Sequence, residues 1–352
     1  MLEAQLQKLV SRGNPPSISL SVVKKGELVY NRAFGLADGP NQIRANADTV
    51  YHWWSLTKVP TAIAILQLHE RGKLDINEPV SRYLTYFDVE YPSHARSEIT
   101  VRQLLKHTSG LADTIPAMIG WIHAEDEIYD QTKLVRQYLP AYKRVKFEPG
   151  SKFLYSNLGY MVLGAIIEEI TDLTYESYVI ENILRPLKMD KTHFLYLPEM
   201  QQNQAVGSHP LFNIYTPLLP FLLDMRMLMR ERVKGTYWFN RVYIDTTPPS
   251  GLIGTAEDAA RLMAGLLNGE ALISENTKMM MHTKGDRITQ RPLGWAEYGE
   301  DEHAWFQHRG GGPGFASVMR IYPDNALGMV IFANSTSSIG NHFIEQVSRI
   351  PW

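Results

Sequence analysis

The sequence predicts an α/β domain assembled from both ends of the chain, with a mostly helical domain inserted between them. Two apolar, alternating segments near the N-terminus, 17–23 and 27–34, predict a β-hairpin around a lysine-glycine turn. Two more strand-like segments, 316–322 and 327–333, lie close to the C-terminus. Helical apolar spacing dominates the residues between them, so strands from both ends are expected to share one layer.

We accordingly assign residues 1–50 and 250–352 to the α/β domain and residues 51–249 to the helical domain. A chain of 352 residues is long enough to bury two such units. The α/β domain also includes predicted terminal helices at 2–12 and 338–349. Residues between Gly35 and Thr49 are expected to form a loop. The other predicted helices cover about 55–71, 99–106, 158–170, 174–184 and 256–267.

Composition excludes several classes of function. A formal net charge of -2 gives no indication of a nucleic-acid partner, and the absence of cysteine excludes disulfides and thiolate chemistry. The N-terminus lacks the continuous apolar region of a signal peptide, and no apolar run is long enough to span a membrane. We expect a soluble chain, either cytoplasmic or exported with its leader removed. The eleven histidines lack ligand spacing, so neither a metal nor another cofactor is expected.

Ser55 and Lys58 lie three residues apart at the predicted start of an apolar helix. Residues at this spacing share a helix face, so the amine is expected close to the hydroxyl. A buried lysine with a lowered pKa can take the proton of a serine nucleophile. The alternative is a helix-capping serine followed by a solvated lysine. Pro60 requires either a small distortion or a helix that begins later than Ser55.

The same spacing occurs once more, at Ser21 and Lys24, but there the context is a strand. Side chains three apart on a strand point to opposite faces, so this second pair is not expected to cooperate. The chain also lacks a G-x-S-x-G elbow, an H-E-x-x-H zinc motif, a P-loop and a dinucleotide-binding glycine motif.

Two further polar motifs each allow a catalytic and a structural interpretation. Tyr155 and Asn157 precede an apolar helix, where a phenol could relay a proton and an amide could bind a carbonyl. Alone, this pair is more typical of a packed tyrosine beside a helix-capping asparagine. The glycine-rich segment 308–314 could supply oxyanion-binding N–H groups, or it could be a flexible turn before a strand.

Together, these three motifs occur in the order of the serine β-lactamase and penicillin-binding-protein superfamily. The chain resembles its class C β-lactamase-like branch, which includes esterases and D-aminopeptidases. Further resemblance lies in residues 104–111, 147–150, 251–258 and 312–315. The resemblance covers most of residues 15–335 and implies an antiparallel sheet flanked by helices.

The resemblance also implies roles for the site residues. Ser55 would be the acylated nucleophile, Lys58 its base and Tyr155 the proton shuttle. Asn157 would hold Lys58 and contact the substrate. The opposite wall would be formed by His308, Arg309 and Gly310, with an oxyanion hole made by the N–H groups of Ser55 and Gly311.

One departure from the family pattern affects the expected substrate. β-Lactamases and penicillin-binding proteins carry Lys-Thr-Gly or Lys-Ser-Gly where this chain has His308-Arg309-Gly310. The missing lysine and hydroxyl help to bind a β-lactam carboxylate, so efficient β-lactam hydrolysis is not expected. Arg309 could replace that contact, or it could point away from the cleft.

An apolar, methionine-rich stretch at 211–233, followed by cations, defines a lid-like segment near 211–243. It could form a lid or pocket wall for an acyl group, make peripheral membrane contact through 211–234, or pack as an ordinary core or dimer contact.

We expect a serine hydrolase that cleaves esters, small amides or D-amino-acid peptides. The alternatives are a true β-lactamase or D,D-peptidase, and a catalytically silent binding protein.

Overall fold

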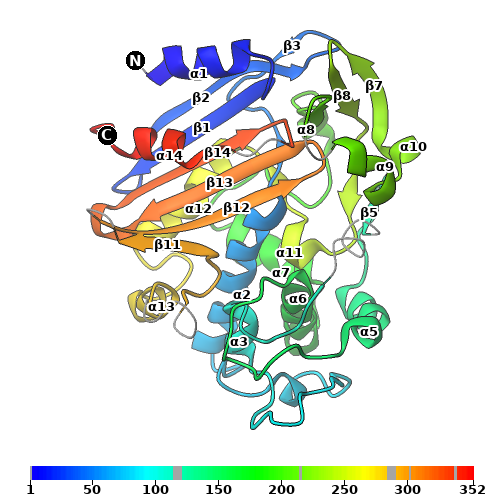
Figure 1. The fold of residues 1–352 in the computed structure, drawn as a ribbon. Coiled ribbons are helices and arrows are strands. Elements are labelled where there is room, and N and C mark those ends of the chain that lie inside the picture. The colour runs from blue at the N-terminus through cyan, green and yellow to red at the C-terminus, as the bar shows by residue number, and fades with distance from the viewer. Residues whose placement is uncertain (1, 114–120, 214–215, 284–290, 301–302, 337–338) are drawn as a thin grey trace.

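The computed structural model describes residues 2–113, 121–213, 216–283, 291–300, 303–336 and 339–352 (Figure 1). Among them, seven strands form one antiparallel sheet in the order β11-β12-β13-β14-β1-β2-β3. These strands are β1 Ser17–Lys24, β2 Glu27–Asp38, β3 Ile43–Arg44, β11 Glu297–Glu300, β12 Ala304–Gly312, β13 Phe315–Tyr322 and β14 Leu327–Ala333. The predicted antiparallel sheet flanked by helices is therefore confirmed.

The two ends of the chain meet in the middle of this sheet. β1 pairs with β14 from Ile18 opposite Ala333 to Lys24 opposite Leu327. Both strands are buried along almost their whole length because helices cover both faces. α1 and α14 pack on one face through residues such as Leu6 and Ile344, and α12 packs on the other (Figure 1).

Most predicted helices are present, with bounds shifted by a few residues. The longer helices are α1 Leu2–Ser11, α2 Lys58–Glu70, α5 Gln131–Tyr142, α6 Asn157–Thr171, α12 Ala256–Leu267 and α14 Asn341–Ser348. The shorter ones are α3 Val101–Leu105, α7 Tyr175–Val179, α8 Pro198–Gln201, α9 Leu219–Leu222, α10 Met225–Leu228, α11 Thr247–Ser250 and α13 Glu275–Met281. A π-helical turn, Ile180–Leu184, continues α7, while η1 Trp54–Thr57 and η2 Val80–Arg82 are 3₁₀ turns.

Side-chain caps explain where several of these helices begin. Thr100 accepts the Gln103 N–H while the Gln103 side chain accepts the Thr100 N–H, which completes a capping box. Thr255 caps α12 by accepting the N–H of Asp258. Such caps satisfy N–H groups that lack an acceptor within the helix.

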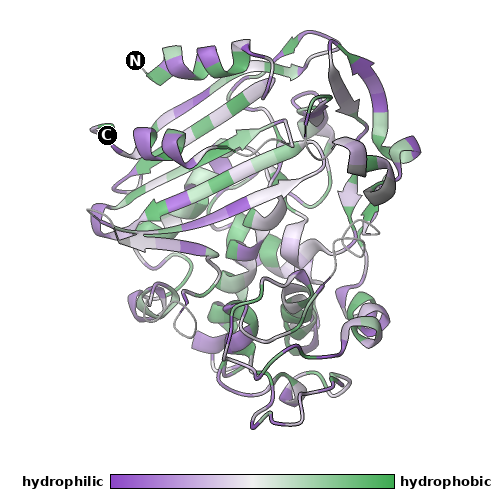
Figure 2. Ribbon diagram, in the orientation of Figure 1, coloured by the Kyte–Doolittle hydropathy of each residue, from purple (hydrophilic) through white to green (hydrophobic). Residues whose placement is uncertain are grey.

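Helices α2 and α6 form the centre of the main core. α2 is buried from Lys58 to Leu68, and α6 from Asn157 to Ile167. Figure 2 shows apolar residues around these helices rather than on a single stripe, as expected for helices enclosed by other elements. Among the described helices, none has the length and apolarity needed to cross a bilayer.

One loop prediction was wrong, and some short strands were not predicted. The segment from Gly35 to Thr49, expected as a loop, contains the end of β2 and all of β3. The region between 51 and 249 also contains short strands that the helical assignment did not include. They are β4 Tyr51–His52, β5 Ile122–His123, β6 Ser208–Pro210, β7 Met229–Val233, β8 Thr236–Phe239 and β9 Tyr243–Ile244; β4 pairs with β10 Ile253–Gly254.

Candidate active site

The Ser55 hydroxyl is presented by a sharp turn rather than by the α-helix itself. Trp54 has a left-handed φ of 50°, which costs a non-glycine residue about 1–3 kcal/mol. The turn is anchored because Ser317 Oγ donates to the carbonyl of Trp53 at 2.9 Å. α2 begins only at Lys58, which leaves Pro60 in its first turn, where a proline N needs no helical partner.

Lys58 is fully buried, and its amine is surrounded by three oxygen atoms. Nζ lies 3.2 Å from Ser55 Oγ, 2.7 Å from Asn157 Oδ1 and 3.0 Å from the Pro249 carbonyl. Burial lowers the pKa of Lys58 to about 7, while the negative charge of Asp113 opposes this shift. These contacts contradict the alternative of a capping serine beside a solvated lysine.

Asn157 is held in one orientation by Asp113. The backbone N–H of Asn157 donates to Asp113 Oδ1 at 2.8 Å, and its Nδ2 donates to Oδ2 at 2.9 Å. Since the side-chain nitrogen faces the carboxylate, Oδ1 is directed toward Lys58. Asp113 thus acts on Lys58 both through its charge and through the amide that it orients.

Tyr155 lies next to the same amine. Lys58 Nζ is 4.8 Å from the centre of its ring, and the phenol is hydrogen-bonded to Ser55. Burial raises the pKa of the Tyr155 phenol, and the hydrogen bond with Ser55 acts in the opposite direction. The resting site therefore combines a lysine that readily loses its proton with a tyrosine that keeps one.

His107 supports Tyr155 from the side, a role that our sequence analysis did not assign. Its ring stacks on Tyr155 with centroids 4.4 Å apart, and its Nδ1 accepts the N–H of Ser156 at 3.1 Å. His107 lies in the stretch 104–111, which resembles the family, so the sequence could have marked it as a candidate site residue. Asp113 and Pro249 gave no comparable signal, because both act on residues far away in sequence.

His308 lies on β12 and packs near Tyr155. Its ring centroid is 6.1 Å from that of Tyr155, and only 1% of the residue is exposed. Burial lowers the pKa of His308 to about 3, and the positive charge of Lys58 adds to this effect. Its Nδ1 lies 2.8 Å from the carbonyl of Arg309.

The glycines after Arg309 allow β12 to approach the nucleophile. A Cβ on Gly310 would lie 2.2 Å from the Trp53 carbonyl and 3.3 Å from the Ser55 N atom. A side chain would therefore push the strand and the Ser55 turn apart. A Cβ on Gly311 would meet nothing within 4 Å, so the backbone at this position borders open space.

Arg309 is directed elsewhere. Neighbouring residues on a strand face opposite sides, and the Arg309 guanidinium is bonded to Glu297, the Ile339 carbonyl and the Asn341 side chain. The sequence-based interpretation of Arg309 as a substrate-binding residue is not supported by this position. Of the predicted residues, the structure brings together Ser55, Lys58, Tyr155, Asn157, His308, Gly310 and Gly311.

Comparison with known proteins places this chain in a family. The family model described as Beta-lactamase matches residues 2–346. The chain belongs to the β-lactamase family. A curated relative, Protein flp of Staphylococcus aureus strain MW2, is 27% identical over 99% of this chain. The chain spans 64% of the length of that relative.

Solved structures share the fold. EstCE1, described as a hydrolase with promiscuous acyltransferase activity, superposes with a TM-score of 0.76 at 20% identity, covering 95% of this chain and 92% of its own. D-amino acid amidase from Ochrobactrum anthropi SV3, complexed with L-phenylalanine, gives a TM-score of 0.73 at 22% identity. That match covers 95% of this chain and 91% of the amidase.

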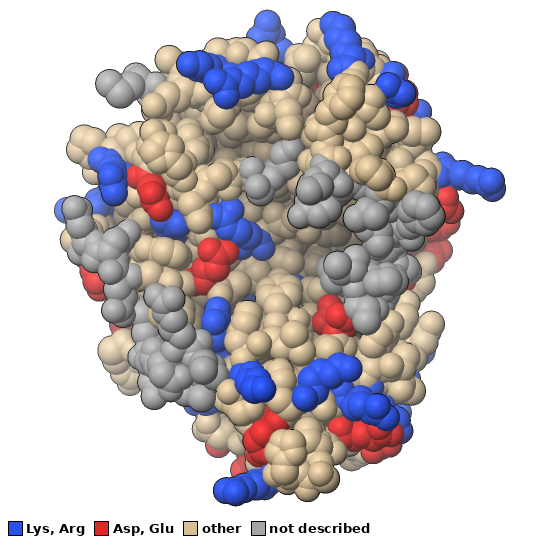
Figure 3. Space-filling view, viewed as in Figure 1, with Lys and Arg blue, Asp and Glu red and all other residues tan. Residues whose placement is uncertain are grey.

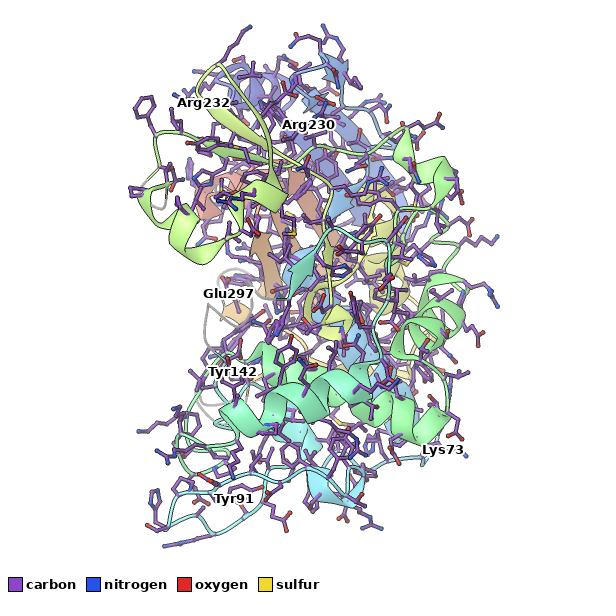
Figure 4. All side chains as sticks on the ribbon, turned by 90° about the vertical axis from the view of Figure 1, so that its right-hand side faces the viewer. Lys73, Tyr91, Tyr142, Arg230, Arg232 and Glu297 are labelled. Atoms are coloured by element: carbon purple, nitrogen blue, oxygen red, sulfur yellow. The ribbon has the colours of Figure 1, made fainter. Side chains whose placement is uncertain are left out.

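The lid-like segment lies beside the far end of β12. The Phe239 N–H donates to the Gly207 carbonyl, and the Ser208 N–H donates to the Gly314 carbonyl, which joins β6 and β8 to the β12–β13 turn. Figure 3 shows a hollow between the sheet and the helical half of the molecule, and Figure 4 shows Arg230 and Arg232 above the level of Glu297.

A small apolar cluster packs part of this segment against β5. It comprises Leu228, Phe239 and Val242 with Ile122, Leu223, Met225, Met227 and Tyr237. The described part of the segment forms a 3₁₀ turn, Thr216–Leu218, then α9 and α10, and then a hairpin of β7 and β8 whose turn residues Lys234 and Gly235 both adopt positive φ. Residues 214–215 lie outside the described part of the segment. Peripheral membrane contact through 211–234 stays a prediction.

Proposed function

We propose that this chain is a serine hydrolase that forms an acyl-enzyme on Ser55 and cleaves carboxylic esters or small amide or D-amino-acid peptide substrates. The observation that carries the proposal is the coordination of the buried Lys58 amine. A neutral amine has two N–H groups and one lone pair. The Asn157 and Pro249 oxygens can only accept, so they take the two N–H groups and leave the lone pair for the Ser55 hydroxyl.

Acylation then begins with proton transfer from Ser55 to Lys58. Ser55 Oγ attacks the carbonyl carbon of the substrate as its proton passes to Nζ, which becomes an ammonium group. The negative charge that develops on the carbonyl oxygen is stabilised by the N–H groups of Ser55 and Gly311. The close approach of β12 at Gly310 supports this placement of the oxyanion hole.

Tyr155 completes the proton path. Because burial keeps the phenol protonated, it donates its proton to the departing alcohol or amine and recovers one from Lys58. In the second half of the reaction, the same pair takes a proton from the water that attacks the acyl-enzyme and returns a proton to Ser55 Oγ as its bond to the acyl group breaks. Asn157 keeps Lys58 in place during both halves and also contacts the substrate.

The alternatives are a true β-lactamase or D,D-peptidase, and a silent binding protein. Replacement of the motif lysine by a buried, uncharged His308 disfavours substrates with an acyl carboxylate. A purely structural role would not require an amine with a pKa lowered to about 7 beside a serine hydroxyl. Both observations favour the esterase and amidase assignment.

The test is a set of initial rates for the wild type and Ser55→Ala. The substrates are p-nitrophenyl esters from acetate to octanoate, nitrocefin and a D-alanyl anilide. We expect ester or anilide turnover that the substitution removes, with little nitrocefin cleavage, while circular dichroism shows an unchanged fold. Dominant nitrocefin cleavage would favour the β-lactamase alternative. If no substrate gave Ser55-dependent turnover, the binding-protein alternative would be favoured.

A further inference from the structure

The short helix α11 has few backbone groups that could fix its position. Two of its four residues, 247–250, are prolines, which lack an N–H donor. The carbonyl of Thr247 accepts the N–H of Gly251 at 2.8 Å and so is used within the same turn. Side chains from neighbouring helices must therefore hold α11 in place. They also hold the Pro249 carbonyl, which accepts a hydrogen bond from Lys58 at 3.0 Å.

One anchor reaches α11 through α2. The Thr61 hydroxyl donates to the Pro248 carbonyl at 2.7 Å and lies 2.7 Å from the Tyr175 hydroxyl. Thr61 has a single hydroxyl proton, which it directs to a carbonyl oxygen, so the Tyr175 phenol must donate to Thr61. Since Tyr175 is the first residue of α7, this anchor connects α11 to the start of α7.

A second anchor joins α11 directly to the next residue of α7. The Thr247 hydroxyl donates to Glu176 Oε1, and both residues are buried. Glu176 Oε2 has no hydrogen-bond partner among the described residues. Burial raises the pKa of Glu176 to about 7, and the negative charges of Glu168 and Asp130 add to this effect. A buried acid of this kind costs stability, and such groups are concentrated at functional sites.

The two anchors lie next to each other. α6, α7 and α11 contact one another in the helical half of the molecule (Figure 1). Tyr175 and Glu176 are consecutive on α7, and the residues they hold, Pro248 and Thr247, directly precede Pro249. A change at either anchor should therefore displace the Pro249 carbonyl.

We propose that Glu176 is a positioning residue that acts through Thr247 to fix the Pro249 carbonyl against the Lys58 amine. This proposal rests on the proposed function and adds a residue that acts on the same site. With the carbonyl fixed, one N–H of Lys58 is held and its lone pair is directed to Ser55. With α11 released from α7, the carbonyl moves and the lone pair loses this direction, which slows proton transfer.

Thr247→Val tests the contact, because it removes the hydroxyl and nearly keeps the shape of the side chain. We expect kcat on the best p-nitrophenyl ester to fall roughly 10- to 100-fold, while KM changes less than about threefold. The acid limb of the pH–rate profile should move to lower pH by roughly 0.5 to 1 unit, because the ammonium form of Lys58 loses an acceptor. A smaller fraction of folded enzyme would lower kcat but could not move the limb.

Thr246→Val is the matched control. It makes the same change one residue earlier, at a buried hydroxyl that has no hydrogen-bond partner in the described part of the chain. It should leave kcat and the acid limb unchanged, and thermal unfolding would compare the stability of the two variants.

Two substitutions of Glu176 separate its hydrogen bond from its charge. Glu176→Gln keeps an oxygen that can accept from Thr247, so kcat should stay within about threefold of wild type. Its acid limb should not move, since the pKa of Lys58 is set by burial and by Asp113 rather than by Glu176. Glu176→Leu removes the acceptor and should reproduce the losses of Thr247→Val.

A double substitution tests whether Glu176 acts through Thr247. Thr247→Val combined with Glu176→Leu should lower kcat no further than either change alone, whereas independent effects would multiply. Multiplied losses would overturn the proposal, as would an unchanged kcat and acid limb in Thr247→Val. It would also be overturned if Glu176→Gln were as damaging as Glu176→Leu, or Thr246→Val as damaging as Thr247→Val. Failure of the proposed function looks different, because the wild type itself would then show no Ser55-dependent release of p-nitrophenol.

Discussion

At the scale of single residues, burial assigns the protonation states that the chemistry needs. Removing Lys58 from water disfavours its charged form, and removing Tyr155 from water disfavours its phenolate. The same physical effect therefore leaves Lys58 partly neutral near pH 7 and Tyr155 protonated, with both side chains beside one serine. Neither state follows from the identity of the residue, since an exposed lysine and an exposed tyrosine would both be protonated at neutral pH.

Replacement of Tyr155 by phenylalanine tests its role as the acid. The ring and its stacking on His107 would remain, but the hydroxyl that we propose as the proton donor to the leaving group would be lost. We expect kcat to fall by roughly 10²- to 10⁴-fold, the usual contribution of general acid–base catalysis. Steady-state rates on the best ester would measure this, with thermal unfolding as the control for folding. Unchanged rates would exclude Tyr155 as the proton shuttle.

If Lys58 is the base that we propose, the acid limb of the pH–rate profile should report its protonation state. Only the neutral amine accepts the serine proton, so kcat/KM should fall as the pH falls through about 7. Asp113 raises the pKa of Lys58, so Asp113→Asn should move the limb to lower pH, whatever its effect on the maximal rate. Asp48→Asn removes a half-exposed carboxylate paired with Lys191 and should leave the limb in place. If neither variant shifted the acid limb, the group that titrates in this limb would not be Lys58.

At the scale of elements, the short helix α11 links the core to the site. The Thr61 hydroxyl donates to the Pro248 carbonyl at 2.7 Å, and Lys58 donates to the carbonyl of Pro249. α6 packs directly on this helix, since a Cβ on Gly164 would lie 2.2 Å from Pro248 Cγ. The position of the Pro249 oxygen therefore depends on the absence of a side chain at Gly164.

Gly164→Ala is expected to disturb both stability and catalysis. The added methyl group overpacks the contact with Pro248, which costs about 1–3 kcal/mol of unfolding free energy and displaces an oxygen that holds Lys58. Gly159→Ala in the same helix is the matched control, because its nearest neighbours would be 3.5 Å away. Urea unfolding and kcat/KM would be measured for both variants. Equal effects of the two substitutions would argue against a specific contact between α6 and α11.

At the scale of the whole molecule, folding depends on joining the two ends of the chain. β1 and β14 are separated by about 300 residues of sequence, yet they pair along their whole length in the centre of the sheet. On one face of the sheet, these two strands contribute Leu20 and Ile331, which lie opposite each other and are fully buried. This core lies on the face of the sheet that α1 and α14 cover.

Ile331→Ala tests how far this core stabilises the molecule as a whole. Loss of the buried side chain should lower the unfolding free energy by about 2–5 kcal/mol. The acid limb of the pH profile should not move, because Ile331 is not among the residues that contact Lys58. Leu28→Ala, at a residue that is 43% exposed, should change stability by less than about 0.5 kcal/mol. Chemical denaturation would measure the unfolding free energy of both variants. Similar losses of unfolding free energy in the two variants would contradict a stabilising role for this core.

The sequence by itself determined the local features of this protein. Alternation predicted β1, β2, β13 and β14, and helical apolar spacing predicted α3 and α12, because these patterns arise between residues close along the chain. The short strands between 51 and 249 were missed. The Lys234-Gly235 turn could have indicated one hairpin, since positive φ at both positions matches the twist of paired strands.

Only the tertiary structure decided the chemistry of the site. The oxygens that direct the Lys58 amine belong to residues 99 and 191 positions away, and no periodicity along the chain encodes such distances. The sequence likewise named His308 and Arg309 together, but the pleat of β12 directs His308 toward Tyr155 and Arg309 toward Glu297. The physical reason is that pKa values and hydrogen-bond partners depend on burial and on neighbours in space. These are set only when the chain has folded and strands from its two ends have paired in one sheet.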